Sequence, residues 1–358
     1  MTKRQRLDTV FSGKKPDRLP VLGGWIAAPA LLLKITGKSA DDYNNDPQGT
    51  AIEAYKELNM DGLVDIFTTN NVNSYRCVDS NPEGYVKSNK GISFEDVEIS
   101  VENLPEPAEY EKSFDFENEY AAFKLQLTTM QEKCGDIVYM PGQWGAGANA
   151  SWYHEYGYEN YLLLAGLRPD LCIKLFKIGG ATGRNRSKLI AAAVKEGIFP
   201  KAVLLGEDIC TQRGSMISPD FLNKHYAPAL AYGLEPLLEA GCRPVWHSDG
   251  DVRELIPMLL DCGVGGFQGF QSECGMVLSE IVKLRTRNGD KLLIFGPISV
   301  TTELPVLMPH EIRRRVRQAV HACRNEADLV LFTSNTINPD VPYHNLMAMY
   351  DEAEYVNY

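Results

Sequence analysis

The chain has 358 residues, 44% of them hydrophobic and 23% charged, which is an ordinary composition for a globular protein. A formal net charge of -11, without any long lysine or arginine block, disfavours nucleic acid as a partner. The basic N-terminal segment lacks an apolar h-region, and no unbroken apolar run is long enough to span a membrane. The eight cysteines are scattered without a C-x-x-C pair, which favours reduced thiols. We therefore expect a cytoplasmic protein that acts on small molecules or binds other proteins.

The first part of the chain contains two short apolar segments that are typical of buried strands. These are residues 18–25 and 61–69, and residues 46–59 between them have a helical pattern. Residues of about 80–130 then break the rhythm with turn-rich and alternating stretches such as "GISFEDVEISV" (91–101). We expect this part to be an insertion that carries a small hairpin and a helix.

From residue 136 onward, short apolar runs alternate with longer helical patterns. The runs are rich in Val, Ile, Leu and Phe, as in strands that are covered on both faces of a parallel sheet. They comprise residues 136–145, 201–208, 243–250, 263–271, 291–299 and 328–335.

The helical segments have recognisable ends. Ser218 and Pro219 begin one helix, and apolar residues recur every four positions over 222–238. Asp251 caps another helix, which ends at Gly263. Eight strand–helix units in a chain of this length predict a (β/α)8 barrel, with residues 1–358 as a single domain. An open doubly wound sheet is disfavoured, because no G-x-G-x-x-G follows the first strand.

The residues that end each apolar run are the candidates for a functional site, because barrels of this kind build the site at the carboxyl ends of the strands. They form a polar ring in which tryptophans are set. Such a ring suits a pocket that packs a flat or apolar ligand and fixes it through a few polar groups. The ring consists of Trp25, Thr68, Thr69, Asn70, Gln143, Trp144, Glu207, Asp208, His247, Asp249, Gln268, Gln271, Ser299, Ser334 and Asn335.

His247 and Glu207 are the candidate catalytic residues of this ring. A lone histidine is usually a hydrogen-bonded structural residue, but His247 ends one strand and Glu207 ends the strand before it. The adjacent carboxylates of Glu207 and Asp208 need a cation, a donor or solvent, which favours a site. Asp251 is better explained as a helix N-cap, whereas Asp249 in the "SDGD" turn is open to either interpretation.

Further members of the ring, together with one arginine of the segment "TQRG", are expected to contact the substrate. The tryptophans could equally belong to the core, since each buries a large area. The arginine could equally form a structural salt bridge. The expected contacts are Trp25, Asn70, Trp144, Asp208, Arg213, Gln271 and Asn335.

Four segments resemble the uroporphyrinogen decarboxylase superfamily. They read "RQRLDTVFSGKKPDRLPV", "GEDICTQRGSMISPDFL", "HSDGDV" and "NTINPDVPYHNLMAMYDEA". The resemblance extends over nearly the whole chain in the expected order, and it also implies a (β/α)8 barrel. The superfamily contains decarboxylases as well as methyltransferases of one-carbon metabolism, which work with corrinoid proteins or thiols.

Two departures distinguish this chain from the decarboxylases that it resembles. Those enzymes carry an Arg-Gln-Ala-Gly-Arg-Tyr run after the first strand, where this chain reads "GGWIAAPALLLKITG" without an arginine. We also expect the Thr68/Thr69 region to replace their essential aspartate near the end of the second strand. A porphyrinogen with many carboxylates needs cationic anchors, so the resemblance implies a methyltransferase.

The thiol-methylating members of the superfamily hold zinc with a His-x-Cys pair and a distant cysteine. Here His247 matches the histidine, but Asp249 stands at the first cysteine position and Asn335 lies near the second. A thiolate-rich site is therefore not expected. Zinc also accepts nitrogen and oxygen ligands, and His247 with Glu207 is the expected pair.

These departures imply an enzyme that demethylates a small methyl ether or methylated amine and passes the methyl group to a Co(I) corrinoid on a carrier protein. His247 and Glu207 would act either as metal ligands or as acid and orienting group for the leaving atom. One alternative is a decarboxylase with a smaller substrate, which would use neither metal nor corrinoid. Another is a non-catalytic barrel that binds a corrinoid or tetrapyrrole. Assembly into a homo-oligomer stays open.

Overall fold

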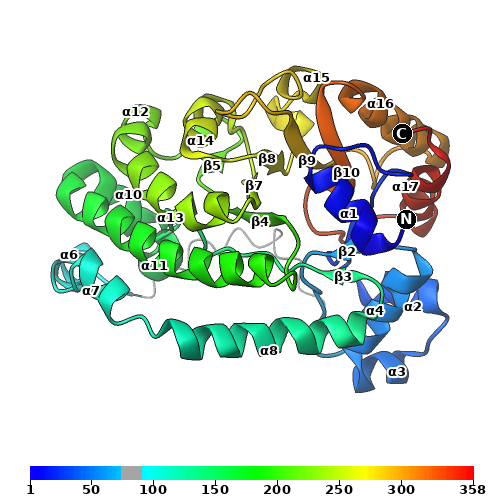
Figure 1. The fold of residues 1–358 in the computed structure, drawn as a ribbon, viewed down its shortest axis with the longest axis horizontal. Coiled ribbons are helices and arrows are strands. Elements are labelled where there is room, and N and C mark those ends of the chain that lie inside the picture. Colours follow the sequence, from blue (N-terminus) through cyan, green and yellow to red (C-terminus); the bar gives the residue numbers. More distant parts are fainter. Residues whose placement is uncertain (74–90) are drawn as a thin grey trace.

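The computed structural model describes residues 1–73 and 91–358, and these form a mixed α/β fold in which strands alternate with helices (Figure 1). Each of the eight predicted apolar runs coincides with a strand that pairs in parallel with its neighbours, and only β10 begins one residue before its run. One sheet has the order β1-β2-β3 and the other the order β10-β9-β8-β7-β4. The strands are β1 Leu22–Gly23, β2 Gly62–Leu63, β3 Val138–Tyr139, β4 Ala202–Gly206, β7 Arg243–His247, β8 Gly266–Gln268, β9 Leu292–Ile298 and β10 Ala327–Thr333, and a small antiparallel hairpin consists of β5 Cys210–Thr211 and β6 Gly214–Ser215.

At least one helix follows every strand of the two parallel sheets, which agrees with the predicted strand–helix repeat. The predicted helix over 218–238 consists of α12, a π-helical turn and α13. The α-helices are α1 Lys3–Phe11, α2 Pro29–Thr36, α3 Ala40–Asn45, α4 Pro47–Glu57, α6 Phe94–Glu102, α7 Pro107–Lys112, α8 Phe116–Cys134, α9 Tyr153–Tyr156, α10 Tyr158–Leu167, α11 Pro169–Lys195, α12 Pro219–Phe221, α13 Ala227–Glu239, α14 Ile256–Cys262, α15 Leu278–Ile281, α16 Pro309–Cys323 and α17 Tyr343–Tyr355.

Each edge of the smaller sheet contacts an edge of the larger one. Val21, just before β1, forms a parallel bridge with Leu331 of β10, whose N–H donates to the Pro20 carbonyl at 2.8 Å. Beyond β3, the N–H of Gln143 donates to the carbonyl of Leu204 in β4 at 2.8 Å. The carboxyl ends of strands from both sheets are thereby brought to one side of the molecule.

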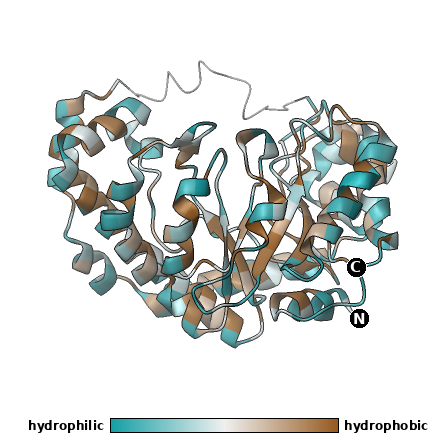
Figure 2. Ribbon diagram, turned by 90° about the horizontal axis from the view of Figure 1, so that it is seen from above, coloured by the Kyte–Doolittle hydropathy of each residue, from teal (hydrophilic) through white to brown (hydrophobic). Residues whose placement is uncertain are grey.

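The strands form the apolar centre of the fold, and helices with hydrophilic outer surfaces surround them (Figure 2). Every residue of β4 and β10 is buried, as expected for strands that are covered on both faces. Helices α11 and α13 pack closely against each other and against the loop before α9. A Cβ atom on Gly183 or Gly233 would lie 2.1 or 1.6 Å from the Gly147 carbonyl oxygen, so this close packing requires glycine at both positions.

The expectation of a hairpin in the insertion is wrong for residues 91–130, which form α6, α7 and most of α8 instead. The Ser93 side chain caps α6 by accepting the N–H of Asp96 at 3.1 Å. Val97 and Val101 are one helical turn apart and both are buried, whereas Ile99 between them is 50% exposed. Helix packing, not the alternating pattern, decides this segment. Residues 80–90 of the predicted insertion lie outside the described residues.

The described cysteines are buried and form no disulfide, which agrees with the expectation of reduced thiols. Burial raises the pKa of Cys134 to about 11 and that of Cys172 to about 12, so both thiols stay protonated near neutral pH. None of the helices within residues 1–73 and 91–358 combines the length and the apolar character that crossing a membrane would need.

Candidate functional site

A cavity of about 1470 Å³ opens at the carboxyl ends of the strands. Its wall comes from the segments that follow β1, β2, β3, β4, β7 and β10, and residues 149–158 contribute a further part. Among the described residues that line it there is no lysine or arginine. The strand ends that the sequence analysis selected therefore meet around one cavity, whose wall is aromatic, acidic and amide-rich.

Most of the candidate residues line this cavity. His247 and Glu207 do, as do the expected substrate contacts Trp25, Asn70, Trp144, Asp208 and Asn335. Arg213 lies outside the lining, at the exposed turn between β5 and β6. Gln271 also lies outside it, and its Oε1 accepts the N–H of Gly250 at 2.7 Å. Gln271 thus fixes the loop after β7.

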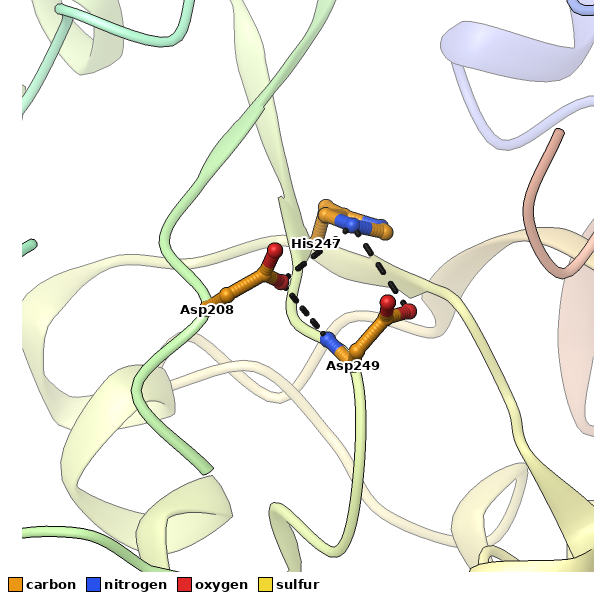
Figure 3. Close-up of side chains that lie close together, drawn as sticks. All are labelled: Asp208, His247 and Asp249. Carbon is orange, nitrogen blue, oxygen red and sulfur yellow. Dashed lines mark hydrogen bonds and ion pairs between the residues drawn. The ribbon is translucent and has the colours of Figure 1, made fainter. Parts of the chain in front are cut away.

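His247 lies next to two carboxylates, those of Asp208 and Asp249 (Figure 3). Its Nε2 is 3.5 Å from Asp208 Oδ1 and 3.9 Å from Asp249 Oδ1. The backbone N–H of Asp249 also donates to Asp208 Oδ1 at 2.9 Å. One nitrogen and two carboxylate oxygens thus lie within 4.8 Å of one another.

This donor set fits a divalent metal ion such as zinc. Zinc bonds of about 2.0–2.1 Å in tetrahedral geometry place ligand atoms roughly 3.3 Å apart, close to the separations around Nε2. Three protein ligands would leave the fourth position open, as in catalytic zinc sites. Glu207, which the sequence analysis expected as a metal ligand beside His247, is not part of this group.

The side chains of this group are held by residues from other strand ends. The Asn335 amide donates to both carboxylate oxygens of Asp249, at 3.0 and 2.8 Å. His247 Nδ1 contacts Gln268 Oε1 on the neighbouring strand β8. Such outer contacts fix the orientation of ligand atoms before anything binds.

Glu207 follows β4, and its side chain is buried. Its Oε2 accepts a hydrogen bond from the Ser151 hydroxyl, and its backbone N–H donates to the His247 carbonyl at 3.0 Å. Gly206 permits this close approach, because its φ is +142° and a Cβ atom there would lie 2.1 Å from the His247 oxygen. Burial raises the pKa of Glu207 to about 8; the Ser151 hydrogen bond opposes the rise and the charge of Asp208 adds to it. Glu207 is therefore largely protonated at neutral pH.

Aromatic rings form the cavity wall beside His247. The ring of Trp144 lies 5.5 Å from the imidazole and that of Trp25 lies 5.9 Å from it, both edge-on. Phe67 stacks on Trp25 at 5.6 Å. Trp25 is buried whereas Trp144 is 37% exposed, so the wall continues from the core to the opening. The wall presents an apolar surface next to the cluster of His247, Asp208 and Asp249.

Asp65 is a carboxylate that the sequence analysis missed. We expected the Thr68/Thr69 region to take the place of an aspartate after the second strand, but Asp65 lies two residues after the end of β2, and Thr68 lies farther along the loop. Asp65 has a φ of +60°, and it accepts the N–H of Gly142 at 3.1 Å. The run "LVDIF" reads as a buried strand that continues past this residue, so the pattern gave no signal for it.

Burial raises the pKa of Asp65 to about 6. The Gly142 N–H opposes the rise, as do the indole N–H groups of Trp144 and Trp25, although Trp25 Nε1 does not reach hydrogen-bonding geometry. Asp65 Oδ2 is buried without a hydrogen-bond partner. The carboxyl group thus lies behind the aromatic wall.

Residues 149–158 are the second contribution that was missed. Asn149, Ser151, Tyr153, His154 and Tyr158 all line the cavity. The aromatic-rich string "SWYHEYGYENY" was the signal that could have identified this segment. It was not selected, because it does not come directly at the end of an apolar run.

No protein-family model and no curated protein matches the sequence. The structure is similar to that of a methyltransferase from Methanosarcina mazei, with a TM-score of 0.63 and 15% sequence identity over 99% of each chain. At this level of identity the similarity concerns the fold, and it extends over both chains from end to end.

Proposed function

We propose that the chain is a methyltransferase that demethylates a small methyl ether or methylated amine and passes the methyl group to the Co(I) corrinoid of a carrier protein. The observation that carries the proposal is the group of His247, Asp208 and Asp249 at the edge of a large, partly aromatic cavity. The resemblance to the methyltransferases of the uroporphyrinogen decarboxylase superfamily and the fold of the Methanosarcina mazei methyltransferase support it.

The fold that we infer for this activity is a closed (β/α)8 barrel. The bridge between Val21 and Leu331 and the hydrogen bond from Gln143 to Leu204 support the joining of the two parallel sheets. In such a barrel the open end that holds the cavity is also the face available to a corrinoid carrier.

In this reaction the C–O or C–N bond to the methyl group breaks, and its electron pair stays on the leaving oxygen or nitrogen. Glu207 lines the cavity and is largely protonated at neutral pH, so it is suited to donate a proton to that atom. The wall of Trp25 and Trp144 excludes water and holds the methyl group beside His247. Neutral amide and hydroxyl groups of the lining orient the rest of the substrate.

His247 Nε2, Asp208 and Asp249 would hold a zinc ion. Bound there, zinc would act as a Lewis acid toward an oxygen or nitrogen of the substrate. Asn335 keeps the Asp249 carboxylate directed at this position.

Zinc binding and methyl transfer together test the proposal. The zinc content of the wild type, measured by mass spectrometry, should be near one ion per chain. Zinc affinity is measured by chelator competition. Affinity should fall at least about 100-fold in His247→Ala and in Asp208→Asn. Glu207→Gln should keep its zinc but lose methyl transfer to Co(I) cobalamin from a panel of methyl ethers and methylamines. Asp136→Asn is the control, because Asp136 is an exposed carboxylate outside the cavity lining. It should change neither zinc binding nor methyl transfer.

A wild-type protein that neither binds zinc nor demethylates any member of the panel would overturn the proposal. The second candidate is decarboxylation. The sequence argument against decarboxylation rested in part on a missing aspartate near the end of the second strand, and Asp65 lies in that region. The absence of lysine and arginine from the described lining still speaks against a substrate with many carboxylates. Release of CO₂ from small carboxylated substrates without corrinoid would decide for this second candidate.

A further inference from the structure

Gln268 contacts the Nδ1 side of His247 and has no role in the reaction proposed above. It ends β8 directly opposite His247 in the parallel register, and it is 3% exposed. Its side chain reaches the end of β10, where Nε2 donates to the carbonyls of Thr333 at 2.8 Å and Ser334 at 3.0 Å. Its Oε1 contacts His247 Nδ1.

These contacts determine which way the amide is turned. Both carbonyls can only accept hydrogen bonds, so they require the NH₂ end of Gln268. The oxygen end must then face His247, and an amide oxygen also can only accept. His247 Nδ1 must therefore carry a proton, which leaves Nε2 of the neutral ring with its lone pair directed toward Asp208 and Asp249.

We propose that Gln268 is a positioning residue that fixes the tautomer of His247 and thereby opens Nε2 toward the cavity. Metal-binding histidines commonly donate their other ring N–H in this way, which sets the ring orientation and raises the basicity of the ligand nitrogen. The use of Nε2 in catalysis rests on the proposed function. The tautomer does not, because it follows from contacts within the chain.

The end of β10 connects Gln268 with the second carboxylate of the group. Its carbonyls at Thr333 and Ser334 hold Gln268, and the next residue, Asn335, holds Asp249. The Thr333 hydroxyl donates to the Asn335 carbonyl at 2.9 Å and fixes this turn. The orientations of the imidazole and of the Asp249 carboxylate are therefore set by one short segment.

Long-range ¹H–¹⁵N NMR on ¹⁵N-histidine-labelled, metal-free protein tests the assignment directly. The spectrum separates the two neutral tautomers and the doubly protonated ring by their distinct patterns. The wild type, with the imidazole neutral, should give the Nδ1–H pattern for His247, which is identified by its loss in His247→Ala. Gln268→Leu should lose that preference and populate Nε2–H.

Two further variants separate the tautomer from general packing. Gln268→Glu still accepts from Nδ1–H and should keep the wild-type pattern, although it loses the donors to β10. Gln143, a member of the predicted polar ring, does not line the cavity and contacts Pro141 and Arg186 instead. Gln143→Leu therefore removes another buried strand-end glutamine and should leave the His247 signals unchanged. Zinc affinity should fall 10–100-fold in Gln268→Leu and remain within about threefold of wild type in Gln143→Leu.

An Nε2–H pattern in the wild type, or an unchanged Nδ1–H pattern in Gln268→Leu, would overturn the inference. The wild-type spectrum decides even if Gln268→Leu does not fold. An Nδ1–H tautomer that depends on Gln268 in a protein that never binds zinc would sustain the inference and contradict the metal-assisted reaction.

Discussion

The two ends of the parallel strands hold their buried carboxylates in opposite ways. At the amino end, Asp61 before β2 is fully buried and accepts from Arg6 at 2.5 Å and from Arg18 at 2.9 Å. At the carboxyl end, Glu207 accepts from the hydroxyl of Ser151, and Asp65 accepts from the N–H of Gly142. One end pairs its carboxylates with arginine, whereas these two at the other end have neutral donors.

The difference separates groups that stabilise the fold from groups that the fold makes reactive. A carboxylate with two guanidinium partners contributes as an ion, and removing it leaves buried positive charge. A carboxyl group that is buried beside neutral donors has its pKa raised, as for Glu207 and Asp65, and the ionised form costs stability. Such raised values cluster at functional sites, which agrees with the location of the cavity.

The largest effect is expected from Asp61→Asn, which would remove the charge between Arg6 and Arg18. The free energy of unfolding should fall by about 3–5 kcal/mol, because both guanidinium groups lose their buried partner. Urea denaturation measures this loss. Asp17→Asn is the matched control, since Asp17 also accepts from Arg6 but is 37% exposed, and its cost should be about 1 kcal/mol. Equal losses in the two variants would contradict the contrast.

Glu207→Gln should change how stability depends on pH. The folded protein keeps the Glu207 proton up to about pH 8, whereas the unfolded chain releases it near pH 4.5. Stability from this group is therefore fully present below about pH 4.5 and is lost as the pH rises toward 8. Between about pH 5 and 7 the loss is about 2.5 kcal/mol, and the glutamine variant should lack it. Urea titrations of both proteins in chelator measure this, and parallel pH profiles would contradict the raised pKa.

Asp65→Asn should have a smaller effect on stability and a distinct optical signature. With a pKa of about 6 instead of 3.8, the carboxyl group accounts for a loss of about 2 kcal/mol between about pH 4 and 6. Its ionisation beside Trp25 and Trp144 should also change tryptophan fluorescence with a midpoint near pH 6. The asparagine variant should lack that transition. A transition of equal size in the variant would assign it to another group.

Arg213→Ala should have the smallest effect. Arg213 lies at the exposed turn of the hairpin after β4, away from the cavity lining. Its replacement should change stability by less than about 0.5 kcal/mol and leave zinc affinity within twofold of the wild type. Chelator competition with the two proteins side by side is sufficient. A tenfold change in zinc affinity would mean that the hairpin moves onto the cavity when zinc binds.

The sequence was most informative where the local pattern and the tertiary environment agree. Strands β4 and β9 are apolar throughout, and β10 is apolar except for Asp328 and Thr333. All of their residues except Pro297 are buried, so their runs could be identified without a structure. Residues 91–101 were misinterpreted, because alternation and helical periodicity both fit Val97 and Val101. Asp65 was missed for a related reason. It follows a strand of only two paired residues, and the apolar run gives no indication that pairing stops there.

The sequence was sufficient to predict the order of the eight strands and their helices and the strand ends at which polar residues collect, because periodicity and apolar runs are local properties of the chain. It thereby placed His247, Glu207 and Asp208 on the same cavity. The folding of the chain decided which carboxylates reach Nε2 of His247, since Asp249 lies two residues away along the chain and Asp208 belongs to another strand end. It also decided that Glu207 turns to Ser151, because hydrogen-bond partners and burial depend on segments that are distant in sequence.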